Sequence, residues 1–174
     1  MIKKRIRELL SSEENSHLYR PCVGIIVLNQ DNFVWVGRRC PVSHDGEISS
    51  LLWQMPQGGI NIREDPLDAA YRELYEETNI KSVSFLGKGC SHVRYDFLEC
   101  HIKDNGYRGQ IQQWFAFRFE GEEDEICVDR IACGYKSEFD TWAWVPLVDT
   151  PDMVVDFKRE AYKQVVSQFS YLLA

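Results

Sequence analysis

Residues Gly58 to Ile80 read Gly-Gly-Ile-Asn-Ile-Arg-Glu-Asp-Pro-Leu-Asp-Ala-Ala-Tyr-Arg-Glu-Leu-Tyr-Glu-Glu-Thr-Asn-Ile, and they hold the strongest structural signal in the chain. Its second half predicts a helix, because five residues recur at the spacing of one helical face that would meet a core: Leu67, Ala70, Tyr71, Leu74 and Thr78. Asp65 is a good N-cap, Pro66 suits the first helical position, and Asn79 tolerates the left-handed conformation that ends helices. Before the helix, Gln57-Gly58-Gly59 is predicted to form a turn.

The same stretch concentrates negative charge. Between residues 64 and 77 one base, Arg72, faces six acids, so this segment carries −5 of the formal −7 of the whole chain: Glu64, Asp65, Asp68, Glu73, Glu76 and Glu77. At about 100° per residue, Glu73, Glu76 and Glu77 share one narrow sector of the helix. Hard divalent cations such as Mg²⁺ prefer oxygen ligands and often join carboxylates to phosphate substrates. Either a cation site or an acidic, solvated face paired with Arg72 fits this pattern.

The sequence predicts strands both before and after this helix. Apolar runs with strand-forming residues occur at 22–28, 33–37, 53–56, 81–88 and 111–119, and Trp142 and Trp144 alternate in a further strand. A second helix is expected near the C-terminus, where apolar residues mark one buried side: Val154, Phe157, Ala161, Val165 and Phe169. Strands interleaved with two such helices predict an α/β protein whose sheet is covered on both faces.

Composition limits the functional class. The 174 residues include 44% apolar and 27% charged residues, which is typical of one globular domain and argues against a disordered chain. No apolar run approaches the ~20 residues that cross a bilayer, so no membrane association is expected. The basic start at residues 1–7 is not followed by an apolar signal segment, and the six cysteines contain no C-x-x-C pair. We therefore expect a cytoplasmic protein with a short N-terminal extension at 1–17 and one domain at 18–174.

The spacing of Gly58, Glu64 and Arg72-Glu73-Leu74-Tyr75-Glu76-Glu77 resembles the Nudix box, the signature of a hydrolase family that cleaves nucleoside diphosphates linked to another group. Six fixed positions coincide by chance on the order of 10⁻⁷ per starting residue. Asn79 stands where the family usually has glycine. Further segments are similar to its bacterial RNA pyrophosphohydrolase and (di)nucleoside polyphosphate hydrolase branch: Tyr19-Arg20-Pro21, Gly37-Arg38-Arg39, residues 53–60, 112–115 and 138–140, and Val154–Arg159.

This resemblance implies an α/β/α sandwich with a mixed sheet, in which the box helix and a C-terminal helix cover the two faces. It assigns metal binding to Glu73, Glu76 and Glu77, and catalytic roles to Glu76 and Glu138. The implied cofactor is Mg²⁺, as two or more ions, with Mn²⁺ or another divalent ion as a possible substitute. Substrate binding would fall to Arg20, Arg38, Arg39, Gly58, Gly59, Phe157 and Lys158.

The resemblance also implies the reaction. The expected activity is removal of pyrophosphate from the 5′-triphosphate end of RNA, which leaves a 5′-monophosphate. The alternative is asymmetric hydrolysis of diadenosine tetra- or pentaphosphate, and a more remote one is a non-catalytic nucleotide-binding Nudix module. Expected partners are therefore triphosphorylated RNA or a dinucleoside polyphosphate. The choice of general base between a box glutamate and Glu138, the oligomeric state, and the roles of the basic N-terminal segment and of residues 40–52 stay open at this stage.

Overall fold

The computed structural model describes residues 16–39, 53–98, 106–131 and 134–173. Their central feature is one eight-stranded mixed sheet. Strand β1 (Tyr19–Leu28) lies in the middle and runs parallel to β7 (Gly109–Phe119), in a register that pairs Tyr19 with Gly109. The predicted sheet, with its long buried strand at 22–28, is confirmed, and both strands extend beyond the predicted apolar runs.

The remaining strands pair antiparallel with this central pair or with each other. β2 (Phe33–Arg39) follows β1 and pairs with β3 (Trp53–Gln54) and with β8 (Phe139–Pro146). β5 (Val83–Lys88) and β6 (Val93–Asp96) both pair with β7. Strand β6 was not predicted, because its four residues offer too short a pattern.

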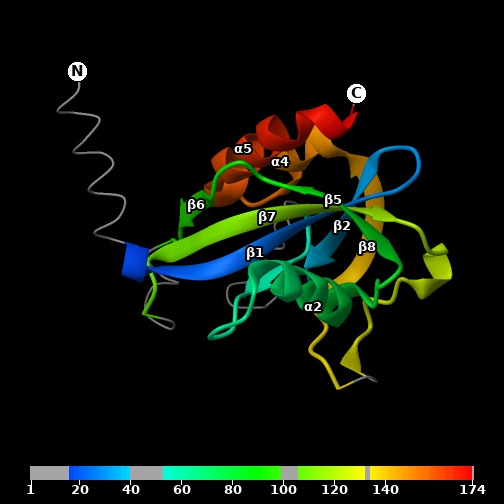
Figure 1. Ribbon diagram of the computed structural model, residues 1–174, viewed down its shortest axis with the longest axis horizontal. Coiled ribbons are helices and arrows are strands. Elements are labelled where there is room, and N and C mark those ends of the chain that lie inside the picture. The colour runs from blue at the N-terminus through cyan, green and yellow to red at the C-terminus, as the bar shows by residue number, and fades with distance from the viewer. Residues whose placement is uncertain (1–15, 40–52, 99–105, 132–133, 174) are drawn as a thin grey trace, which may run out of the picture.

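Helices cover both faces of the sheet, as predicted. Helix α2 (Pro66–Thr78) lies on one face, and α4 (Thr150–Met153) and α5 (Arg159–Phe169) lie on the other (Figure 1). Short 3₁₀ turns complete the fold: η1 (Ser16–Leu18), η2 (Glu123–Glu125), η4 (Leu147–Asp149), η5 (Asp156–Lys158) and η6 (Ser170–Leu173). None of the described helices combines the length and apolarity that a bilayer crossing would require.

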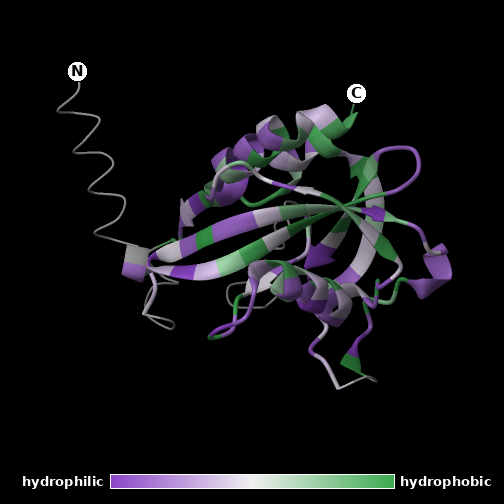
Figure 2. Ribbon diagram, in the orientation of Figure 1, coloured by the Kyte–Doolittle hydropathy of each residue, from purple (hydrophilic) through white to green (hydrophobic). Residues whose placement is uncertain are grey.

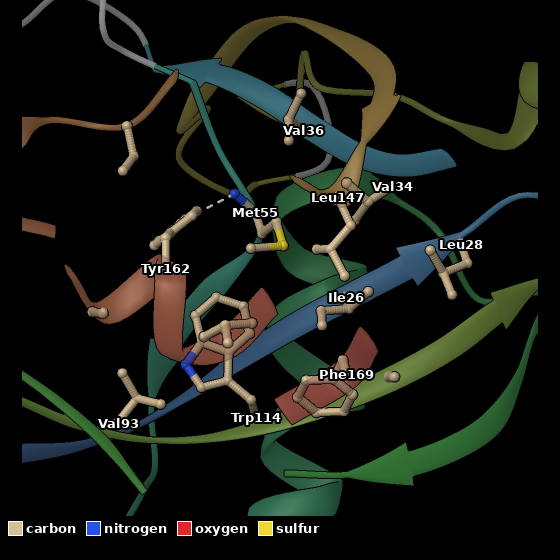
Figure 3. Packing of buried hydrophobic residues seen from close by; sticks show 14 of the residues in the cluster. Ile26, Leu28, Val34, Val36, Met55, Val93, Trp114, Leu147, Tyr162 and Phe169 are labelled. Carbon is tan, nitrogen blue, oxygen red and sulfur yellow. Dashed lines mark hydrogen bonds between the residues drawn. The ribbon is translucent and has the colours of Figure 1, made fainter. Parts of the chain in front are cut away.

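Alternation along β1 divides the interior into two cores. Val23, Ile25 and Val27 point toward α2, whereas Ile26 and Leu28 belong to the cluster beneath α5. In that second cluster the Tyr162 hydroxyl accepts a hydrogen bond from the backbone N–H of Met55 at 3.1 Å (Figure 3). Both helices carry apolar and polar residues, as expected for elements buried on one side (Figure 2).

Three local predictions were wrong. Gln57-Gly58-Gly59 is not a turn but strand β4 (Gln57–Gly59), because it pairs antiparallel with β1 and places Gly59 opposite Cys22. The C-terminal helix begins at Arg159, so Phe157 and Lys158 lie in the 3₁₀ turn η5. Tyr71, expected in the core, is 38% exposed and rests its ring against Phe117 at a centroid distance of 4.8 Å.

Candidate active site

The ends of α2 fix where its glutamates lie. The Asp65 side chain accepts a hydrogen bond from the Leu67 N–H, Pro66 opens the helix, and Asn79 ends it at φ 64°, as the sequence predicts. Because Leu74 and Ala70 are buried against the sheet, the helix cannot rotate without exposing them. Glu73, Glu76 and Glu77 are therefore held in register along the edge of β4.

Arg72 organises the acidic cluster from its centre. Its guanidinium donates to both carboxylate oxygens of Glu64 at 2.7 and 2.8 Å, and to the carbonyl oxygen of Gly59 at 2.8 Å. A further N–H donates to Glu73 at 2.7 Å and contacts Glu76 at 3.4 Å. The hydrogen bonds that Glu64 accepts from Arg72, together with one from the Asn61 N–H, lower the pKa of Glu64 to about 2. Arg72 thus ties the loop before α2 to the helix itself.

The two glycines of β4 make room for charged side chains on opposite faces of the strand. A Cβ at Gly58 would coincide with the carboxylate of Glu73, and one at Gly59 would collide with the guanidinium of Arg20. Any side chain at residue 58 would therefore displace Glu73 from the cluster. The glycines act through the space that they leave free, rather than through the turn that the sequence predicts.

Glu77 is the most buried carboxylate of the cluster, with 7% of its surface exposed. Its Oε2 accepts a hydrogen bond from the backbone N–H of Gln57 at 3.2 Å. Burial raises the pKa of Glu77 well above its usual value, and the charges of Glu73 and Glu138 raise it further. Burial also raises the pKa of Glu73, an effect that Arg72 opposes. Loss of hydration therefore disfavours the charged form of both carboxylates.

Glu138 joins this cluster from the loop before β8. Its carboxylate binds Arg39 at 3.3 Å and Lys136 at 3.2 Å. Arg39 is itself close enough to Glu77 to oppose the rise in that carboxyl's pKa. Arg38, the preceding residue of β2, instead forms a two-pronged ion pair with Asp140 at 2.8 and 3.1 Å.

Lys158 lies inside the protein rather than in solvent. It is 4% exposed, and its Nζ donates to Oε1 of Gln54 at 3.0 Å and lies 5.3 Å from the centre of the Tyr95 ring. Burial lowers the pKa of Lys158 to about 7, with Arg39 contributing in the same direction and Glu77 opposing it. The neighbouring Phe157 is partly buried, and its ring centre lies 5.9 Å from that of Tyr95.

A chain of carboxamides leads away from these residues along β7. The Trp114 indole can only donate a hydrogen bond, so Oε1 of Gln112 accepts it at 3.1 Å. The Gln112 amide then donates to Gln57 at 3.2 Å and to Gln110 at 3.0 Å, and Gln110 also accepts from the Tyr95 hydroxyl at 2.7 Å. Each amide orientation is thereby determined, down to the residues beside the glutamate cluster.

The structure thus brings most of the predicted site residues together. Glu73, Glu76, Glu77, Glu138, Arg39, Arg20, Gly58 and Gly59 form one group, with Lys158 electrostatically coupled to it. Arg38 is held at the surface by Asp140. Sequence reasoning missed the roles of Arg72 and Gln54. A single base among six acids was the available signal for Arg72, whereas nothing in the sequence indicated the buried Gln54–Lys158 pair. The segments at 1–15 and 40–52 lie outside the described residues.

The donor set fits a hard divalent cation. Within the described ranges, no three acidic, histidine or cysteine side chains converge into a ready-made metal cage. Mg²⁺ usually keeps several waters and binds through one or two carboxylates plus substrate phosphates, so such a cage is not required. Glu73, Glu76 and Glu77 offer oxygen ligands only, and the buried charge of Glu77 would gain a counter-charge from the ion.

Comparison with known proteins identifies this arrangement. The model of the NUDIX domain family matches residues 18–165, which include every residue of the cluster. The chain belongs to the Nudix family. A Nudix relative named RNA pyrophosphohydrolase, from Rhizobium meliloti (strain 1021), is 51% identical over 162 residues, which cover 89% of this chain and 95% of the relative. Another relative of that name, from Brucella anthropi, is 49% identical over 161 residues, which cover 90% of this chain and 92% of the relative.

Solved Nudix structures agree on the fold. The E. coli dihydroneopterin triphosphate pyrophosphohydrolase superposes with a TM-score of 0.60 at 19% identity, covering 86% of this chain and 98% of that one. Nudix hydrolases generally require divalent cations, in keeping with the oxygen-rich cluster on α2. The predicted family, the α/β fold and the hydrolase class are all confirmed.

The burial of Glu77 gives a prediction about pH. In the folded, metal-free Nudix protein the pKa of Glu77 is raised, so the folded state keeps a proton that the unfolded state has already lost. Stability must therefore fall as pH rises from the unfolded pKa through the folded one. We expect Glu77→Gln to match the wild type near pH 4 and to melt at a higher temperature near pH 8, measured by thermal unfolding in EDTA.

Excess Mg²⁺ supplies the control for this prediction. A cation that binds only the folded wild type stabilises it by mass action. The difference in melting temperature between Glu77→Gln and the wild type at pH 8 should therefore shrink or change sign when Mg²⁺ replaces EDTA. Equal melting temperatures of the two proteins across the whole pH range would contradict a raised pKa of the buried Glu77 carboxyl.

Proposed function

We propose that this chain is a Mg²⁺-dependent RNA pyrophosphohydrolase, which removes pyrophosphate from the 5′-triphosphate end of RNA and leaves a 5′-monophosphate. The observation that carries the proposal is about 50% identity, over most of both chains, to relatives named RNA pyrophosphohydrolase. The complete glutamate cluster supports catalysis over the alternative of a nucleotide sensor without activity, which would be expected to lack one of these ligands. We further propose the cytoplasm as its compartment and residues 18–174 as its catalytic domain.

In the proposed mechanism, Glu73, Glu76 and Glu77 would hold two or more Mg²⁺ ions. When bound, these ions would supply positive charge to the phosphate oxygens and lower the pKa of a water molecule. Water attacks phosphorus, the anhydride bond between the α- and β-phosphates breaks, pyrophosphate leaves, and the proton of the water passes to a carboxylate. Glu76 and Glu138 are the proposed catalytic carboxylates, because both lie at the cluster and a deprotonated carboxylate can accept that proton.

The basic residues would bind the substrate phosphates from the other side. Arg39 lies beside Glu138, and Arg20 lies over Gly59. Lys158, coupled electrostatically to Glu77 and Arg39, would be stabilised in its charged form by an incoming phosphate, since negative charge raises the pKa of an amine. Arg38 would first have to leave Asp140, at small cost, because the pair is exposed.

Phe157 is proposed to stack on a base at the RNA 5′ end. Its partly exposed ring is tilted by 48° relative to that of Tyr95 and belongs to the residue next to the buried Lys158. Stacking of this kind is worth about 1–3 kcal/mol per base. We therefore expect Phe157→Ala to lower kcat/KM on triphosphorylated RNA by about 10-fold and to affect diadenosine tetraphosphate less.

The half-exposed Phe33 at the start of β2 provides a matched control ring. Phe33→Ala should leave both substrates unaffected. An equal loss on both substrates for Phe157→Ala would assign Phe157 to core packing instead of base stacking.

A side-by-side assay tests the function itself. Triphosphorylated RNA and diadenosine tetraphosphate are incubated with the protein, with and without Mg²⁺, and the products are resolved by mass. Faster release of pyrophosphate from RNA, dependent on Mg²⁺, is the expected result. Preferential formation of ATP plus AMP would make the chain a dinucleoside polyphosphate hydrolase, and no cleavage of either substrate would overturn both assignments.

A further inference from the structure

Arg130, in the loop between η2 and β8, has almost no contact with solvent. It is 1% exposed, although an arginine at a surface loop would ordinarily extend into water. Its Nε donates to the backbone carbonyl of Glu76 at 3.1 Å, and its Nη1 donates to Oδ1 of Asn79 at 2.9 Å. The guanidinium lies 5.0 Å from the ring centre of Tyr75 and 5.2 Å from that of Tyr135. Arg130 thus binds the C-terminal turn of α2 through hydrogen bonds and ring contacts.

The backbone of the same residue holds the loop that carries Glu138. The Arg130 N–H donates to the Ser137 hydroxyl at 2.9 Å, and the Arg130 carbonyl accepts from the N–H of Tyr135 at 3.1 Å. Ser137 is the residue directly before Glu138. One residue therefore links the peptide group of Glu76 to the neighbour of Glu138, through hydrogen bonds at both ends.

Ending the helix does not by itself require this arginine. The left-handed Asn79 already ends α2, and its amide is further held by the carbonyl of Glu125 at 2.8 Å. A cation near a helix C-terminus is favourable, but burying it costs several kcal/mol of hydration. A buried guanidinium is useful where two elements must keep one separation, because its planar, fixed donors set both distance and angle.

The two elements that Arg130 joins carry like charges. Glu138 faces the carboxylates of α2, and its charge acts on Glu77 directly. Like charges inside a partly buried cluster repel, and the ion pairs of Glu138 with Arg39 and Lys136 offset this repulsion in part, since the charge of Glu138 still raises the pKa of Glu77. A loop held only by its ends would relieve that repulsion by moving outward.

We propose that Arg130 is a positioning residue that sets the distance between Glu138 and the glutamates of α2. The inference rests on the proposed function, because it takes Glu138 to be a catalytic carboxylate. In this role Arg130 acts by placing Glu138 relative to α2, because its hydrogen bonds go to the Glu76 carbonyl, Asn79 and Ser137. A shift of about 1 Å in a reacting group can cost about 100-fold in rate, so the tie matters for turnover well beyond its contribution to stability.

A double-mutant cycle tests the proposal. The variants are Arg130→Met, Glu138→Gln and their combination, with kcat and KM measured on triphosphorylated RNA. Arg130→Met is expected to lower kcat by about 10- to 100-fold with KM nearly unchanged. In the Glu138→Gln background the same substitution should cost less than 2-fold, because no catalytic carboxylate then remains to be misplaced.

Two further variants distinguish a positioning effect of Arg130→Met from general loss of the folded protein. Ser137→Ala removes the loop half of the tie with less disturbance and should show the same dependence on Glu138. Arg94 provides the matched control, because its guanidinium also packs over an aromatic ring, 4.8 Å from the centre of Tyr19, yet lies on β6. Arg94→Met should leave kcat unchanged in both backgrounds.

The outcomes separate this inference from the proposed function. If Glu138→Gln lowers kcat and Arg130→Met and Ser137→Ala lower it equally in both backgrounds, the positioning role is overturned and the proposed function stands. If Glu138→Gln has no effect on kcat, the catalytic assignment of Glu138 fails, and the positioning role fails with it. Loss of the effect of Arg130→Met in the Glu138→Gln background supports the proposal.

Discussion

Replacing Glu73 with glutamine is expected to lower kcat by about 1,000-fold while the protein stays folded. The amide has the shape of the carboxylate, so it can still occupy the space above Gly58 and accept from Arg72. It lacks the charge that a divalent cation needs, and losing about 4 kcal/mol of stabilisation of the transition state corresponds to this factor. The measurement is single-turnover hydrolysis of triphosphorylated RNA at saturating Mg²⁺.

Glu160→Gln is the matched control, because Glu160 is an exposed acid on α5 whose ion-pair partner is Lys163. It should retain full activity. Thermal unfolding in EDTA should be similar for wild type, Glu73→Gln and Glu160→Gln. A Glu73→Gln protein with wild-type kcat would remove Glu73 from the proposed metal site.

Replacing Arg72 with lysine is expected to lower kcat by about 100-fold and also to lower the melting temperature. The guanidinium reaches Glu64, Glu73 and the Gly59 carbonyl at once, and a lysine ammonium cannot reproduce that fork. With Arg72 about one-quarter exposed, breaking the network should cost about 1–2 kcal/mol, or roughly 2–8 °C for a domain of this size. Glu73 would then move by the ångström or so that is enough to impair catalysis.

Lys163→Met on α5 is the control, since it breaks an exposed ion pair of similar length. It should change the melting temperature by less than about 2 °C and leave kcat intact. Lowered stability without any loss of activity in Arg72→Lys would show that Arg72 supports the fold and not the arrangement of the glutamates.

Local chemistry explains which elements were predictable. The caps at Asp65 and Asn79 determine the bounds of α2 through contacts within a few residues, so the sequence alone was sufficient there. The segment 57–59 was misassigned because its two glycines favour a turn, whereas its pairing with β1 depends on residues some 35 positions away. Similarly, the apolar spacing at 154–169 extends through the 3₁₀ turn η5, which periodicity does not distinguish from a helix.

The candidate site follows the same division. The three glutamates of α2 were predictable because helical geometry alone places them together. Glu138 and Lys158 came from family resemblance, since their proximity to α2 depends on how distant segments pack. The burial of Lys158 against Gln54 could not be foreseen, because 104 residues separate the two in the chain. Arg130 escaped notice for the same reason, as its partners lie 51 and 54 residues away.

The parallel pairing of β1 with β7 has a consequence for how the protein is made. Tyr19 pairs with Gly109, so about 90 further residues must be synthesised before β1 can pair with β7. At 5–20 residues per second, a ribosome takes roughly 5–18 s to supply them. During that interval the apolar run from Val23 to Leu28 lacks its main partner, and such exposed strands tend to associate with other chains. Newly made protein should therefore depend on chaperones during synthesis, even though the finished enzyme buries the run from Val23 to Leu28 completely.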